Sequence, residues 1–228
     1  MNGLALPVFH SIRVVLFDLD GTLIDSAPDM GAATNRMRSD RGLPALPLEH
    51  YRHRAGSGAR GMLAAGFGMA SDHPEYEAHK EEFFVNYDQC LTERTRIFDG
   101  AEELVRELIA SGRQWGVVTN KSTRYSIPLA RAFTLFASAA TIISGDTTPH
   151  TKPHPAPLLE AVRRIGVSPA DCLYVGDDER DVIAGRAAGM GTVAASYGYL
   201  GVNANTRTWG ADAVIDSPLA LLQLLREA

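Results

Sequence analysis

Two aspartates stand two residues apart, directly after a short apolar run near the start of the chain. Residues 14–17 are continuously apolar, and Asp18 and Asp20 follow them just before Gly21. Where strand geometry persists, side chains two positions apart leave the same face of the chain. Two close carboxylates repel each other unless a cation lies between them. The pair therefore points to a cation site at the end of a strand.

Three further apolar runs also end in polar residues. Each run is short, continuous and followed by a turn, which is typical of a strand buried on both faces. In an open α/β sheet, ligands bind beyond the carboxyl ends of the strands, so the four loops are expected to meet at one place. The polar residues are Thr119 and Asn120 after residues 115–118, Lys152 in the loop after residues 141–143, and Asp177, Asp178 and Asp181 after residues 172–175.

These residues have complementary chemistry for a phosphate group. The carboxylates after the last run would complete an oxygen-rich shell that suits Mg²⁺ better than zinc or copper. Lys152 would neutralise a phosphoryl oxygen as a point charge. Thr119 and the backbone N–H groups around Gly21 and Asn120 would donate hydrogen bonds to the same group. The set predicts a phosphoryl-transfer site.

Any one of these loops, taken alone, is as consistent with a structural turn as with a site. Asp, Asn and Gly are the commonest turn residues, and their side chains also cap the helices that follow strands. The order D-x-D-G-T, then Thr after a strand, then Lys-Pro, then G-D-x-x-x-D is much more specific than a single pair. The four loops together favour catalysis.

Helical periods separate the strands from residue 97 onward. Apolar residues recur at helical spacing before Gly112 and again before Gly166, where glycine is expected as a C-terminal cap. Asp99 with Glu102 predicts a capping pair at the start of the first of these helices. The alternation predicts an α/β fold whose core is a doubly wound, Rossmann-like parallel sheet with right-handed crossovers.

Residues 25–96 break this alternation, because they show helical periods and breakers but no convincing buried strand. We interpret them as an inserted all-helical cap domain, with residues 1–24 and 97–228 as the core domain. Within the insert, Arg54 and Arg60 flank Gly56–Gly58. They are either ordinary surface arginines or substrate-binding residues that face the mouth of the site and hold an anionic or sugar substrate.

The composition excludes several classes of function. The 228 residues are 45% hydrophobic and carry a formal net charge of −5, with Lys and Arg scattered along the chain. This charge provides no basic field for nucleic acid, and no run reaches the roughly 18 apolar residues of a membrane span. Cys90 and Cys172 show no zinc spacing and are expected as reduced thiols. We expect a cytoplasmic monomer or homodimer that acts on a small molecule.

The motifs together resemble those of the haloacid dehalogenase superfamily of phosphohydrolases. The resemblance rests on Phe17–Leu23, Thr119 with Asn120, Lys152 and Gly176–Asp181, and it covers essentially the whole chain. It implies a small phosphorylated metabolite as substrate and Mg²⁺ as cofactor. The helical insert resembles the first type of cap found in that family.

The resemblance also implies which residues carry the reaction. Asp18 would be the nucleophile that forms an aspartyl phosphate. Asp20 would be the general acid for the leaving oxygen and later the base that takes a proton from water. Thr119 and Lys152 would bind the transferring phosphoryl group.

The metal site implied by the resemblance uses the same aspartates. Mg²⁺ would be held by Asp18, by the backbone carbonyl of Asp20 and by Asp177. Asp178 and Asp181 would act through water or orient the groups that bind the metal.

Two branches of the family match different segments. The phosphoglycolate phosphatases are similar over Asp25–Asp29, Thr119–Lys121 and Lys152–Leu158. The phosphatases of N-acetylmuramic acid 6-phosphate are similar over Gly58–Met62, Val118–Lys121 and Trp209–Asp212. The core motifs do not separate the branches, because each branch needs the same chemistry. We place phosphoglycolate first and the muramic acid ester second.

Two other hypotheses come from outside these branches. A sugar phosphomutase uses the same aspartyl phosphate but returns the phosphoryl group to the sugar, so release of inorganic phosphate without a bisphosphate would exclude it. A noncatalytic phospho-receiver or binding module is a different class of protein. Receivers are much shorter than this chain and lack an inserted helical segment.

Overall fold

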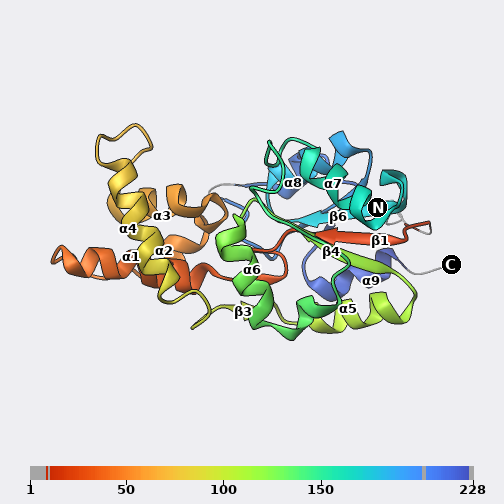
Figure 1. Ribbon diagram of the computed structural model, residues 1–228, viewed down its shortest axis with the longest axis horizontal. Helices are drawn as coiled ribbons and strands as arrows, with labels where there is room; N and C mark the ends of the chain where they lie inside the picture. The colour runs from red at the N-terminus through yellow and green to blue at the C-terminus, as the bar shows by residue number, and fades with distance from the viewer. Residues whose placement is uncertain (1–8, 10, 202–203, 226–228) are drawn as a thin grey trace, which may run out of the picture.

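The core of the protein is a six-stranded β-sheet in which every paired strand is parallel (Figure 1). The computed structural model describes residues 9, 11–201 and 204–225. β1 lies between β4 and β6, so the chain adds strands first on one side of β1 and then on the other. The carboxyl ends of these three strands therefore surround the crevice in which doubly wound sheets bind ligands. The strands, in order across the sheet, are β5 (Ile142–Ile143), β4 (Gln114–Val118), β1 (Val14–Phe17), β6 (Cys172–Gly176), β7 (Gly191–Ala195) and β8 (Ala213–Ile215).

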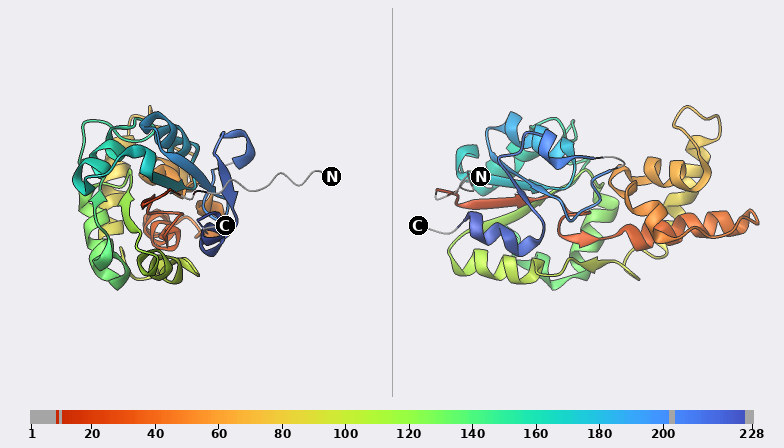
Figure 2. Two further views of the ribbon diagram at one scale, coloured as in Figure 1. Left: turned by 90° about the vertical axis from the view of Figure 1, so that its right-hand side faces the viewer. Right: turned by 180° about the vertical axis from the view of Figure 1, so that it is seen from behind.

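Helices cover both faces of this sheet, which explains why its strands are continuous apolar runs (Figure 2). In β1, Val15 and Phe17 belong to the apolar cluster of α5, α6 and α9, whereas Val14 and Leu16 belong to that of α7 and α8. The predicted doubly wound α/β core is therefore confirmed. The helices are α5 (Ala101–Ala110), α6 (Thr123–Ala132) and α9 (Leu221–Leu224) on the first face, and α7 (Ala156–Ile165) and α8 (Glu179–Ala188) on the second.

Four helices form a second lobe, which we call the cap (Figure 1). They enclose their own apolar cluster, whose buried side chains include Met37, Met62 and Phe83. Tyr125 and Tyr199, which follow core strands, belong to the same cluster, so the two lobes share part of their packing. The helices are α1 (Ala27–Asp40), α2 (Leu48–Arg52), α3 (Gly58–Phe67) and α4 (Tyr76–Asp88), and they lie between the antiparallel two-residue strands β2 (Ile24–Asp25) and β3 (Arg96–Ile97).

Two local details differ from the prediction. α5 begins after Gly100, whose φ is 83°, and no side chain caps it. The predicted Asp99 cap is wrong, because Asp99 lies one residue too early to occupy the capping position. β7 was not predicted, since its Gly-Thr-Val-Ala-Ala sequence is short and built mostly from small residues. The structure also has short 3₁₀ helices at Ala55–Ser57, Thr134–Ser138, Pro169–Asp171, Thr206–Thr208 and Pro218–Ala220.

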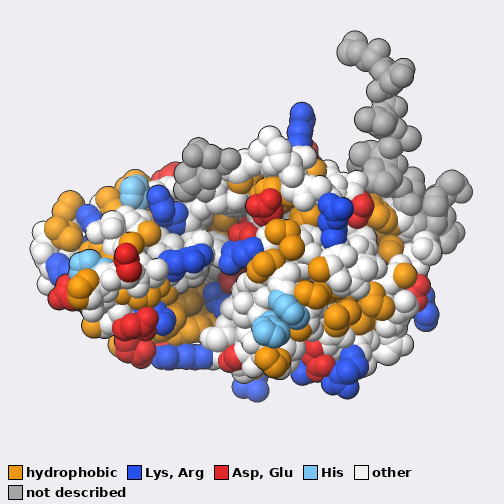
Figure 3. Space-filling model, turned by 90° about the horizontal axis from the view of Figure 1, so that it is seen from above, with side chains coloured by type: hydrophobic (Ala, Val, Ile, Leu, Met, Phe, Trp, Pro, Cys, Tyr) orange, Lys and Arg blue, Asp and Glu red, His pale blue; other side chains and the backbone are white. Residues whose placement is uncertain are grey.

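The cap stands over the carboxyl ends of the sheet strands, because the chain enters it shortly after β1. Figure 3 shows the two lobes from above, with acidic and basic side chains where they meet. In the part of the chain that the structure describes, no helix combines the length and apolar character needed to cross a membrane.

Candidate active site

A cavity of about 270 Å³ lies between the carboxyl ends of the strands and the cap. The cap contributes Met30 and residues 55–58 to its walls, and the core contributes the loops after β1, β4, β5 and β6. The four polar loops selected from the sequence thus meet at one place. The lining residues from the core are Asp18, Asp20, Thr119, Asn120, Lys121, Thr151, Lys152, Asp177, Asp178, Arg180 and Asp181.

A larger hollow of about 890 Å³ lies at the amino ends of β1 and β4. Glu107 is the single carboxylate among its described lining residues, and its basic residues are Arg13 and Arg113. The acidic groups that could hold a metal and attack phosphorus are all in the smaller cavity. Size alone therefore does not locate the site, and the chemistry of the lining does.

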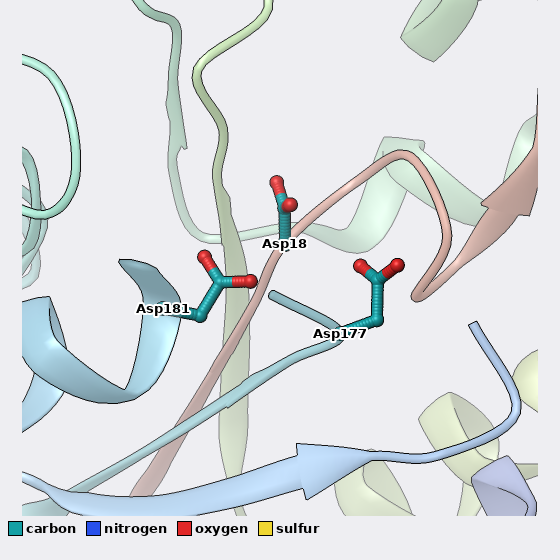
Figure 4. Close-up of side chains that lie close together, drawn as sticks. All are labelled: Asp18, Asp177 and Asp181. Carbon is teal, nitrogen blue, oxygen red and sulfur yellow. The ribbon is translucent and has the colours of Figure 1, made fainter. Parts of the chain in front are cut away.

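Three aspartates of the smaller cavity form a cluster (Figure 4). Asp18 follows β1, Asp177 follows β6 and Asp181 lies in the first turn of α8, and one oxygen from each lies within 4.8 Å of the others. Figure 4 shows the three side chains close together, each from a different segment of the chain. A buried group of carboxylate oxygens is the donor set that hard divalent cations prefer. The cluster therefore fits a divalent metal ion.

Asp177 is a buried member of this cluster. Its side chain accepts hydrogen bonds from the Thr22 hydroxyl at 3.0 Å and from the Tyr199 backbone N–H at 2.7 Å. Burial, and then the charges of Asp18 and Asp181, raise the pKa of Asp177 well above its ordinary value. A bound cation would oppose both effects. The electrostatics therefore agree with the donor chemistry.

Gly21 makes room for Asp177. Its φ of 84° favours glycine, and a Cβ at this position would lie 2.1 Å from an Asp177 carboxylate oxygen. The Gly21 N–H donates to the carbonyl of Ile24 at 2.9 Å, and Gly21 does not line the cavity. Gly21 therefore lies against Asp177 and outside the cavity in which the sequence predicted it to bind substrate.

Lys152 forms ion pairs with two of the three aspartates. Its Nζ lies 3.0 Å from Asp18 Oδ1 and 2.7 Å from Asp181 Oδ1, and it donates to the Val118 carbonyl at 3.0 Å and the Tyr174 hydroxyl at 2.7 Å. Burial lowers the pKa of Lys152, but the two carboxylates outweigh burial, so the pKa is raised overall. The ammonium is therefore kept charged beside the nucleophile that the sequence predicts.

The two carboxylate oxygens of Asp18 differ in their interactions. Oδ1 accepts the Leu19 N–H at 2.7 Å in addition to its ion pair with Lys152. In the described part of the chain no hydrogen bond reaches Asp18 Oδ2. An oriented carboxylate with one unpaired oxygen is well placed for attack on phosphorus or for binding a cation.

Asp178 and Asp181 form a capping box at the start of α8. The Asp178 side chain accepts from the Arg180 N–H at 2.9 Å, and Asp181 Oδ2 accepts from the Asp178 N–H at 3.0 Å. Asp181 uses its other oxygen on Lys152. Both carboxylates are thus held in place by the start of α8.

Asp20 has a different set of partners. It accepts hydrogen bonds from the Ser26 hydroxyl and from Lys121 Nζ, whose distances to the two carboxylate oxygens are 3.0 and 3.2 Å. Lys121 is buried and its Nζ lies 5.1 Å from the centre of the Tyr87 ring of the cap. The predicted general acid is therefore held by Ser26, which lies between β2 and α1, and by the loop after β4.

Thr119 and Asn120 occupy the loop after β4. The Thr119 hydroxyl accepts the Lys121 N–H at 3.2 Å and is buried against the cavity. The Asn120 amide pairs with the backbone of Lys152, donating to its carbonyl and accepting its N–H, both at 2.9 Å. The side chain of Asn120 thus positions the backbone of Lys152, and Asn120 also lines the cavity.

The two predicted cap arginines lie outside the cavity wall. Arg54 and Arg60 are exposed, and neither is among the lining residues, although residues 55–58 between them are. Arg180 lines the cavity instead: it forms a two-point ion pair with Asp178 and donates to the Gly56 carbonyl at 2.8 Å. Arg180 was present in the quoted motif, but no local signal indicated its contact with the cap.

Tyr199 was also missed by the sequence analysis. Its hydroxyl accepts from the backbone N–H groups of Ser26 and Ala27 at 2.7 and 2.9 Å and donates to Asp25 at 3.0 Å. Its backbone N–H binds Asp177. Tyr199 thus joins the aspartate cluster to the start of the cap. The sequence shows no signal for this contact, because the partners lie more than 170 residues apart.

Comparison with known proteins agrees with this geometry. A model of the haloacid dehalogenase-like hydrolases matches residues 12–189. An N-acetylmuramic acid 6-phosphate phosphatase of Pseudomonas aeruginosa is 39% identical over 217 residues, which cover 95% of this chain and 96% of that protein. A phosphoglycolate phosphatase of Xanthomonas campestris pv. campestris is 45% identical over 206 residues, covering 90% and 93%.

A solved structure is similar over almost the whole chain. It is described as a predicted phosphoglycolate phosphatase from Haemophilus somnus, and it has a TM-score of 0.82 and 28% identity, covering 94% of this chain and 98% of that one. The present chain belongs to the haloacid dehalogenase-like hydrolases. More narrowly, it is a phosphatase in the group that contains both phosphoglycolate and N-acetylmuramic acid 6-phosphate phosphatases. The family and enzyme class expected from the sequence are confirmed.

Proposed function

We propose that this phosphatase hydrolyses 2-phosphoglycolate through an aspartyl phosphate on Asp18, with Mg²⁺ as its cofactor. In the first step, Asp18 Oδ2 forms a bond to phosphorus while the bond from phosphorus to the ester oxygen breaks. Asp20 gives a proton to that oxygen, and glycolate leaves. The ion pair between Asp18 Oδ1 and Lys152 supports this step, because it fixes the carboxylate and offsets negative charge on the phosphoryl group.

The second step frees the enzyme. A water oxygen forms a bond to phosphorus, Asp20 accepts a proton from this water, and the bond between phosphorus and Asp18 breaks to release inorganic phosphate. Thr119, which lines the cavity beside Asp18, and the backbone of Asn120 donate hydrogen bonds to the phosphoryl oxygens. The same carboxyl group of Asp20 thus serves both steps.

The metal is proposed from the carboxylate cluster. Asp18, Asp177 and the backbone carbonyl of Asp20 would hold Mg²⁺, and Asp181 and Asp178 would orient them. When bound, the ion supplies positive charge against the phosphoryl oxygens and the nucleophile. Five carboxylates and three cationic side chains line the cavity, so two negative charges are left for a divalent ion to balance.

The observation that carries the choice of substrate is the size of the cavity. Its 270 Å³ falls below the roughly 300–1,000 Å³ typical of sites for drug-sized ligands. Phosphoglycolate has two carbons, whereas the muramic acid ester adds an acetylated sugar ring and a lactyl group. The relatives named above include both activities, with the higher identity in the phosphoglycolate phosphatase. The muramic acid ester is the second candidate, because that relative covers slightly more of the chain.

The test compares kcat/KM for the two esters on one preparation, with inorganic phosphate as the readout. We expect a preference of at least tenfold for phosphoglycolate, without any requirement for a bisphosphate activator. A tenfold preference for the sugar ester would replace the substrate we propose. A dependence on a bisphosphate, with the phosphoryl group retained on a sugar, would indicate a mutase.

The metal assignment has its own test. Asp177→Asn keeps the shape of the side chain but removes its charge from the cluster, so the Mg²⁺ concentration needed for half-maximal activity is expected to rise at least about tenfold. Asp212→Asn is the matched control, because that carboxylate accepts hydrogen bonds from Thr192 and does not line the cavity. Unchanged Mg²⁺ activation in Asp177→Asn would remove this residue from the metal site.

A further inference from the structure

Three cationic side chains line the cavity in the described part of the chain, and they differ in how fully they are used. Lys152 has four oxygen partners around an ammonium group that has three N–H donors. Arg180 is neutralised by a two-point pair with Asp178. In the described part of the chain, the hydrogen bonds of the Lys121 ammonium group go to Asp20 alone. Lys121 therefore keeps a donor for a ligand.

The surroundings of Lys121 strengthen any interaction it makes. Its side chain is 9% exposed, and the cap covers it with the ring of Tyr87. A charge pair is worth more in such a place than at the surface, because little water screens it.

Lys121 places a positive charge beside the general acid that the sequence predicts. Its ammonium contacts Asp20, and Asp20 must contact the leaving oxygen to protonate it. In 2-phosphoglycolate the carboxylate carbon is only two bonds from that oxygen. In the muramic acid ester, the carboxylate is on the opposite side of the sugar ring from the phosphate. A cation beside Asp20 is therefore within reach of the first carboxylate and far from the second.

We propose that Lys121 binds the carboxylate of a small 2-phospho carboxylic acid, in the place where the sequence suggested Arg54 and Arg60. The inference rests on the function proposed above and adds the residue that recognises the leaving group. Both arginines are exposed and do not line the cavity, whereas Lys121 does. The recognition is thus made from the core, beside the general acid.

The experiment uses two substrates that differ only in the carboxylate: 2-phosphoglycolate and ethyl phosphate. Lys121→Met is expected to raise KM for phosphoglycolate about 10–100-fold more than KM for ethyl phosphate, the effect of losing a charge-assisted hydrogen bond in a buried site. Its effect on kcat is expected to be equal for the two substrates, because the lost contact with Asp20 serves both. Lys121→Arg, which keeps the charge, is expected to retain most of the preference.

Arg54→Ala and Arg60→Ala are the matched controls, and both are expected to leave the ratio of the two kcat/KM values within about twofold. If Lys121→Met does not fold, Lys121→Gln takes its place, because its amide still donates to Asp20 but carries no charge. An equal loss on both substrates in these variants would overturn the proposal, since Lys121 would then act through Asp20 alone. A loss confined to phosphoglycolate in Arg60→Ala would also overturn it.

Failure of the proposed function looks different. It would be seen in the unmodified enzyme, as a preference for the muramic acid ester or as equal kcat/KM for phosphoglycolate and ethyl phosphate. The Lys121 proposal fails separately when the unmodified enzyme prefers phosphoglycolate and Lys121→Met keeps that preference.

Discussion

The floor of the cavity and its roof are held in very different ways. The floor consists of Asp18, Lys152, Asp177 and Asp181, and the side chains of Lys152 and Asp181 are each 2% exposed. The roof is the cap segment of residues 55–58, in which Gly56 and Ser57 are exposed. One hydrogen bond, from Arg180 to the Gly56 carbonyl, joins this segment to the core in the part of the chain that the structure describes.

Because of this difference, the floor and the roof are expected to tolerate substitutions unequally. Groups that are buried and fully paired are already oriented for the transition state, and changing one of them disturbs its neighbours. A segment held by few contacts changes position or sequence with little effect on the core. Relatives with different substrates but closely similar chains are what such a division would allow. Variants of the two regions are therefore expected to differ in both the size and the kind of their effects.

The largest effect is expected from the floor. Asp18→Asn removes the nucleophile, so hydrolysis of every substrate is expected to fall at least about 10⁴-fold. The fold is expected to persist, because the asparagine oxygen can still accept the Leu19 N–H. Phosphate release and a thermal melt on the same preparation measure both effects. Activity within tenfold of the unmodified enzyme, in a folded variant, would contradict the assignment.

Asp20→Asn is expected to reduce the rate about 10²–10⁴-fold for alkyl phosphates, because the leaving oxygen loses its proton donor. An aryl phosphate leaves more easily without a proton, so its loss is expected to be smaller. Mg²⁺ activation is expected to change little, since the proposed ligand at this position is a backbone carbonyl. Equal losses for alkyl and aryl phosphates would count against the general-acid role of Asp20.

These two residues show how far the sequence alone leads. Asp18 and Asp20 lie directly after a buried apolar strand, so their position at a sheet edge follows from a local pattern and a general rule about parallel sheets. The strands β1, β4, β5 and β6 and the helices α5 and α7 were predicted from the same kind of local pattern. The confirmed fold and family depend on such patterns.

The contacts that tune the site are not local. Lys121 was part of a matching segment, but only the folded chain brings it against Asp20, 101 residues away. Tyr199 meets Asp25 across 174 residues. The exposed side chains of Arg54 and Arg60 show the converse, because a glycine-rich neighbourhood in the sequence does not say which way an arginine points. Tertiary packing decides these positions, and no periodicity records it.

A smaller effect is expected from Tyr199, which joins the core to the start of the cap. Tyr199→Phe removes the acceptor of two buried N–H groups at the start of α1 and a donor to Asp25. The free energy of unfolding is expected to fall by about 2 kcal/mol, within the range for unsatisfied buried donors. Mg²⁺ activation is expected to stay unchanged, because Asp177 is bound by the backbone of Tyr199 and not by its hydroxyl.

Tyr197→Phe is the matched control for Tyr199→Phe. Its hydroxyl donates to a single carbonyl, that of Thr22, at 3.0 Å, so its removal leaves no buried N–H group unpaired. Urea unfolding of the two variants is expected to show the larger loss for Tyr199→Phe. Equal losses would mean that the hydrogen bonds to the start of α1 contribute nothing beyond those of an ordinary buried tyrosine.

The smallest effect is expected from the roof. Arg180→Ala removes the hydrogen bond to the Gly56 carbonyl, and the guanidinium is 32% exposed, so its contribution is screened by water. KM is expected to rise by about threefold for phosphoglycolate and ethyl phosphate alike, with kcat nearly unchanged, because residues 55–58 then close less often over the cavity. Arg124→Ala is the matched control: Arg124 also joins core to cap, through Asp88, but it does not line the cavity. A rise in KM for both variants would mean that the cap responds as one rigid body to any lost contact. A large fall in kcat for Arg180→Ala alone would mean that the pair of Asp178 and Arg180 supports the aspartate cluster. The roof and the floor would then not act independently.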